Sequence, residues 1–115
     1  MNREPSFARV IKNARKDKGF SQKALAKKIG VDFTYLSKLE NNRSNYSPRE
    51  EVIRGLAKHL DLDEEELIFL AGRIPECDSK FLKKNYRGMA VLFRRMRQNP
   101  SFAQKIFSEA ADNEQ

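Results

Sequence analysis

The sequence predicts an all-α protein. Over the first 72 residues, apolar side chains recur at spacings of three and four, which places them on one face of a helix. Capping and turn residues divide this region into short helices. No segment alternates apolar and polar residues, and no β-branched run is long enough for a sheet. We therefore expect a five-helix domain followed by a helical C-terminal extension.

The chain has 115 residues, about enough for one modest core, and carries a net charge of +7. This charge is unevenly distributed. Residues 1–43 hold 11 basic and 4 acidic side chains, residues 44–77 hold 4 and 8, and residues 78–115 hold 8 and 4. A basic block beside an acidic one is typical of a protein with a nucleic-acid-binding side, although a solvated basic face would also explain it.

Several classes of protein are disfavoured. The single cysteine, Cys77, cannot form an internal disulfide, and the N-terminal residues lack the apolar run of a signal peptide. No stretch approaches the roughly 20 apolar residues that cross a bilayer. We expect a cytoplasmic protein without a membrane partner.

The first three helices are short. The first begins near Pro5 or Ser6 and ends before Gly19. The second starts at an N-cap, Ser21, and stops at Gly30 after about two turns. The third starts at residue 32 and ends in the polar run 41–45.

The fourth and fifth helices each begin with a predicted capping box. In the fourth, Ser47 is the cap, Pro48 is the first helical residue and Glu50 completes the box. In the fifth, Asp63 and Glu66 repeat the pattern.

A domain boundary is predicted near Pro75, because proline disfavours helix in the preceding residue, Ile74, and cannot itself continue a helix. This divides the chain into a domain of residues 1–74 and a linker with helical extension of residues 75–115. The extension contains an amphipathic helix up to residue 98. Its apolar side chains, the C-terminal stripe, are Leu82, Tyr86, Met89, Phe93 and Met96. The stripe must pack on residues 1–72, on a second copy or on another protein.

Residues 21–43 carry the functional signal, because only Gly30, Val31 and Asp32 join two short helices. A tight crossing needs a small residue between the helices, which Ala26 supplies, and a left-handed turn, which Gly30 adopts at little cost. This pattern predicts a helix-turn-helix, whose second helix enters the major groove of DNA.

The segment resembles the Cro/phage-repressor (xenobiotic-response-element, XRE) helix-turn-helix family over about residues 5–72. The matching pattern is Ser21-Gln22-x-x-Leu25-Ala26-x-x-x-Gly30-Val31-x-x-x-Tyr35-Leu36-Ser37-x-Leu39-Glu40-Asn41. The resemblance implies a repressor-like fold and a regulator that binds double-stranded DNA. It further implies a repressor that acts as a homodimer on a two-fold-related operator.

The resemblance also implies roles for individual residues. Base-facing positions are occupied by Asp32, Phe33, Thr34, Ser37 and Lys38, and phosphate-contacting positions by Gln22, Lys23, Asn41, Arg43 and Ser44. Relatives often have a polar residue at the position of Phe33, which here can pack on a thymine methyl or cover a neighbouring side chain. Arg15 and Glu40 match a semi-buried structural ion pair, and Tyr35 is expected to fill the core.

Dimer or partner contacts are expected from the fifth helix, with Leu67, Ile68 and Leu70, together with the C-terminal stripe. One His, one Cys and no phosphate-binding loop disfavour an enzyme. We expect no cofactor, no metal and no small-molecule site. The alternative is an antitoxin or adaptor whose C-terminal helices bind a regulatory protein partner.

Overall fold

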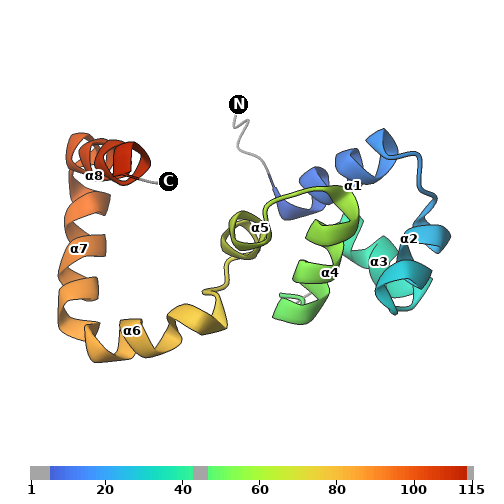
Figure 1. Ribbon diagram of the computed structural model, residues 1–115, viewed down its shortest axis with the longest axis horizontal. Helices are drawn as coiled ribbons and strands as arrows, with labels where there is room; N and C mark the ends of the chain where they lie inside the picture. Colours follow the sequence, from blue (N-terminus) through green and yellow to red (C-terminus); the bar gives the residue numbers. More distant parts are fainter. Residues whose placement is uncertain (1–5, 43–46, 114–115) are drawn as a thin grey trace. The chain divides into compact units, whose positions relative to one another are not determined.

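The computed structural model describes residues 6–42 and 47–113 of the chain. In these ranges the backbone forms α-helices and one short 3-10 helix and no strand, which confirms the all-α class (Figure 1). None of the described helices combines the length and apolar character that a membrane crossing requires. The chain divides into two compact units, residues 1–76 and 77–115. Each unit is described by itself.

The first unit contains five helices, namely α1 (Phe7–Asp17), α2 (Gln22–Ile29), α3 (Phe33–Glu40), α4 (Glu50–Leu60) and α5 (Glu64–Leu70). Every helix contributes at least one fully buried side chain to a shared core: Ile11, Leu25, Leu36, Leu56 and Ile68 are each 0% exposed. Burial of one such side chain contributes about 1.5–3 kcal/mol. The predicted apolar stripes are the faces that meet in this core.

Three helices of the first unit have an N-cap side chain that makes a capping hydrogen bond, at Ser6 and at the predicted caps Ser21 and Asp63. The side chains of Ser6, Ser21 and Asp63 accept backbone N–H groups at 3.2, 3.0 and 3.0 Å. Each bond satisfies one of the free donors in the first turn of a helix. Asp32 is the N-cap of α3 but makes no side-chain cap hydrogen bond.

The capping box predicted for α4 is wrong. The helix begins at Glu50. The hydroxyl of Ser47 instead donates to the carbonyl of Ala71 at 2.8 Å. The carboxylate of Glu50 accepts the backbone N–H of Glu76 at 2.8 Å and Nε of Arg54 at 2.9 Å. Two groups distant in sequence, at Ala71 and Glu76, and Arg54 of the next helical turn therefore replace the predicted cap partners.

The predicted linker is anchored to the first unit. Pro75 is fully buried, and the neighbouring Glu76 N–H is bound by Glu50. The division between the units accordingly falls after residue 76, two residues beyond the predicted boundary.

The second unit contains a 3-10 helix (Glu76–Asp78), α6 (Ser79–Lys84), α7 (Tyr86–Gln98) and α8 (Pro100–Asn113). The single helix predicted up to residue 98 is interrupted at Asn85, whose side-chain amide donates to the carbonyl of Phe81 at 2.9 Å. Short amide side chains compete in this way with regular helix bonding. No side chain among residues 77–112 is buried.

Candidate nucleic-acid interface

Helices α2 and α3 form the predicted helix-turn-helix. Gly30 ends α2 in the left-handed conformation, with φ of 74° and ψ of 32°. The N–H of the next residue, Val31, donates to the carbonyl of Ala26 at 3.0 Å and closes the turn. Ala26 is only 2% exposed, which agrees with the need for a small residue in this part of the core.

A buried ion pair fixes the position of α3. Nε and Nη2 of Arg15 donate to the two carboxylate oxygens of Glu40 at 2.7 and 2.9 Å. Gln22 donates to the same carboxylate at 3.0 Å, and Nη1 of Arg15 donates to the carbonyl of Phe20 at 2.8 Å. The C-terminal end of α3 is thus bonded to both α1 and the start of α2, and Arg15 and Glu40 are buried among structural contacts.

The outward face of α3 carries the side chains expected to read bases. Phe33, Thr34 and Lys38 are exposed, as is Asp32 at the start of the helix. Leu36 and Leu39, on the opposite face, are buried. The helix therefore presents hydroxyl, ammonium, carboxylate and aromatic groups to solvent from a rigidly packed base.

Phe33 lies beside a lysine of α2. The ammonium of Lys23 is 5.5 Å from the centroid of the Phe33 ring, within the range of a cation–π contact. Phe33 therefore covers a neighbouring side chain, one of its two expected roles, and its 40% exposure leaves apolar surface available. The contact also places Lys23 beside the start of α3.

The remaining residues predicted to contact phosphate follow the last residue of α3. The side-chain amide of Asn41 donates to the carbonyl of Ser37 at 2.9 Å and to its hydroxyl at 3.4 Å. Ser37 is thus bonded to the residue that follows α3. Its side chain is half-buried, whereas that of Asn41 is exposed. Arg43 and Ser44 lie outside the described residues.

The expected dimer residues on α5 need correction. Leu67 and Ile68 are 3% and 0% exposed, so the helical period directs them into the core of the first unit. Leu70 is half-buried. Phe69, which the sequence analysis did not select, is 53% exposed. The helical period was the signal, because at about 100° per residue Phe69 falls on the side of α5 opposite Leu67 and Ile68. Tyr35 is half-buried and packs against the core, as expected.

The C-terminal stripe is only partly covered within its own unit. Tyr86 and Phe93 are 61% and 48% exposed, whereas Leu82, Met89 and Met96 are half-buried.

Comparison with known proteins identifies the helix-turn-helix. The family model HTH_3, described as helix-turn-helix, matches residues 11–67. A relative from Bacillus phage phi105, the ImmF control region 10 kDa protein, is 39% identical over 54 residues. That match covers 47% of this chain and 58% of the phage protein, less than two thirds of its length.

Two solved structures are also similar. The structure of SinR, a master regulator for biofilm formation, in complex with DNA is 34% identical, with a TM-score of 0.49. The match covers 54% of this chain and 97% of the chain in that structure. The SinR–SinI protein complex is 25% identical, with a TM-score of 0.50, and the match covers 92% of this chain and 91% of that one. The chain belongs to the HTH_3 (XRE-type) helix-turn-helix family of DNA-binding transcriptional regulators, which is not a family of enzymes.

Proposed function

We propose that this protein represses transcription by binding a two-fold-related operator as a homodimer, with α3 in the major groove. The observation that carries the proposal is the buried bond network at Glu40, which holds α3 while Phe33, Thr34 and Lys38 stay exposed. A recognition helix must be fixed in this way, because base contacts depend on precise side-chain positions.

The exposed groups suit the two kinds of DNA contact. Thr34 and Lys38 can donate to base edges, and Asp32 can accept from a cytosine amine. Lys23, at the start of α2, suits a phosphate, since free N–H groups at a helix N-terminus also favour anions. Gln22 keeps one amide N–H beyond its bond to Glu40. Arg43 and Ser44 are proposed as further phosphate contacts.

Selection from random duplexes tests sequence-specific binding. We expect an enriched motif, and replacement of Thr34 or Lys38 by alanine should weaken binding to it by about 1–3 kcal/mol with little change on random DNA. Arg43→Ala should instead weaken binding to all duplexes alike. Failure of the wild-type protein to enrich any motif would refute the proposal.

Dimerisation is proposed to use the second unit. Its exposed apolar side chains include Tyr86, Val91, Phe93 and Phe107, which are 48–61% exposed. A helix pair that covers so little apolar surface itself needs another surface against which to pack. Two copies on DNA would also supply the specificity that one helix-turn-helix lacks.

Light scattering and footprinting test the dimer. We expect Phe93→Asp to produce monomers and to abolish protection of a two-fold-related site, whereas Gln104→Asp, an exposed change in α8 of the same unit, should leave both unchanged. A Phe93→Asp protein that stays dimeric and protects the full site would exclude the C-terminal stripe as the dimer surface.

A second candidate role for this unit is binding a regulatory protein. The likeness to the SinR–SinI complex extends over 92% of the chain and therefore reaches the second unit. If Phe93→Asp leaves the dimer intact, an adaptor or antitoxin role for the stripe is favoured. Titration with a candidate partner should then show binding that this variant loses.

A further inference from the structure

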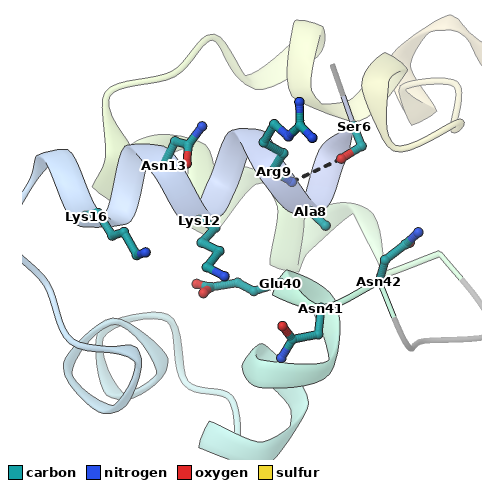
Figure 2. A pocket seen from close by; sticks show the side chains of 9 residues that line it. All are labelled: Ser6, Ala8, Arg9, Lys12, Asn13, Lys16, Glu40, Asn41 and Asn42. Atoms are coloured by element: carbon teal, nitrogen blue, oxygen red, sulfur yellow. Dashed lines mark hydrogen bonds between the residues drawn. The ribbon is translucent and has the colours of Figure 1, made fainter. Parts of the chain in front are cut away.

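An open groove of about 470 Å³ lies between α1 and the end of α3 (Figure 2). It falls outside the base-reading face of α3 described above. Its lining is almost entirely polar and consists of Ser6, Ala8, Arg9, Lys12, Asn13, Lys16, Glu40, Asn41 and Asn42.

Three cations occupy one side of this groove. Arg9, Lys12 and Lys16 are spaced by three and four residues on α1, so they share one face of the helix. Lys12 points toward the end of α3 in Figure 2. No ion pair joins any of the three to a carboxylate of the described residues. Their positive charge is therefore available to a ligand.

The one carboxylate in the lining does not neutralise these cations. Both oxygens of Glu40 accept hydrogen bonds from Arg15, and one of them also accepts from Gln22. The Arg15 charge balances the Glu40 charge within the buried pair. The groove consequently keeps an excess of positive charge.

Dipolar groups add to this preference for an anion. The first turn of α1 contains no acidic residue, so the positive end of its helix dipole is not offset there. Asn13 and Asn42 also line the groove with amide groups that can donate, whereas the Asn41 amide, which lines it too, already donates to Ser37. Cationic and amide donors together match the oxygens of a phosphate group.

We propose that this groove holds a backbone phosphate of the operator, so that α1 contributes to DNA binding through Lys12 and Lys16. The inference rests on the proposed DNA-binding function. Asn41 connects the two, because it lines the groove and is one of the residues that the family resemblance predicts to contact phosphate. The groove is open and large compared with the ~30 Å³ that one water occupies, so its volume does not exclude a phosphate group.

Salt-dependent DNA affinity tests the assignment in the full-length chain. The variants are Lys12→Gln and Lys16→Gln, with Lys58→Gln, an exposed lysine of α4 outside the groove, as the charge-matched control. Binding to the selected operator and to a random duplex is measured from about 50 to 200 mM salt. Each groove variant should reduce the slope of log K against log salt by about 0.9, equally for both duplexes, while the control keeps the wild-type slope.

Different outcomes separate the two proposals. If wild-type protein enriches no motif and binds no duplex, the proposed function fails. If it enriches a motif but the groove variants retain the slope of Lys58→Gln, the groove does not contact DNA.

Inorganic phosphate is then titrated at constant ionic strength while side-chain amide signals of Asn13 and Asn41 are followed by NMR. Saturable shifts with an unchanged DNA slope would overturn the operator assignment in favour of a free anion. Thermal unfolding checks that each variant folds.

Discussion

The two units differ in how they use their apolar residues. The first buries side chains from five helices in one core, and several helix ends are fixed by capping bonds. Residues 77–112 contain none that is buried, and aromatic side chains such as Tyr86 remain largely exposed. The first unit therefore has the packing that folding on its own requires, whereas the second must gain stability from a further surface.

The largest expected effect is the loss of a core side chain in the first unit. Leu36→Ala should lower the free energy of unfolding by about 3–5 kcal/mol, because Leu36 is fully buried and its removal leaves a cavity. Leu92→Ala, at a half-buried position in α7, should cost about 1 kcal/mol or less where the chain is monomeric. Urea unfolding measures both. Equal losses would contradict the difference between the units.

The buried ion pair should produce the next largest effect. Glu40→Ala should cost on the order of 3 kcal/mol, because it leaves the Arg15 guanidinium buried without its carboxylate. The double variant Arg15→Ala, Glu40→Ala should lose less than the sum of the single changes, although the Phe20 carbonyl also loses its donor. Additive losses in urea unfolding would show that the pair is not energetically coupled.

Helix capping predicts a smaller and selective effect. Asp63→Ala should destabilise the first unit by about 1 kcal/mol, because it removes the hydrogen bond to the Glu66 N–H. Asp32→Ala is the matched control, since the Asp32 side chain makes no cap bond. Thermal unfolding should therefore distinguish the two variants. A larger loss for Asp32→Ala would mean that its carboxylate has another structural role.

The smallest expected effect is a change in stability at acidic pH. It involves Glu50, whose carboxylate accepts the Glu76 N–H at the end of the first unit. The Glu76 N–H and the Arg54 guanidinium hold the pKa of Glu50 below its ordinary value of 4.5. The pKa of Glu50 is lower in the folded state than in the unfolded state. The stability that its bonds contribute is therefore present above the unfolded pKa and is lost as pH falls through the folded pKa.

Glu50→Gln should accordingly reduce the loss of thermal stability between pH about 7 and about 3. Glu51→Gln, at an exposed neighbour paired only at the surface, serves as the control. Identical acid profiles for wild type and Glu50→Gln would show that the Glu50 bonds do not contribute to folding.

Local sequence determined the five helices of the first unit and the site built on them. Three kinds of feature act within a few residues: the spacing of apolar residues, the caps at Ser21 and Asp63, and the left-handed Gly30. They can therefore be predicted from the sequence without knowledge of tertiary contacts. The outward positions of Thr34 and Lys38 follow from the same period.

Tertiary structure decided which partner each polar group obtained and which apolar residues stayed exposed. Ser47 and Glu50 were assigned to a local cap, yet Ala71, Glu76 and Arg54 provide their partners. The contacts with Ala71 and Glu76 join residues far apart in sequence, and no local pattern encodes them, whereas Arg54 lies only four residues from Glu50. The gathering of Lys12 and Asn41 around one groove likewise depends on how the helices pack, because α1 and the end of α3 are brought together only in the folded unit.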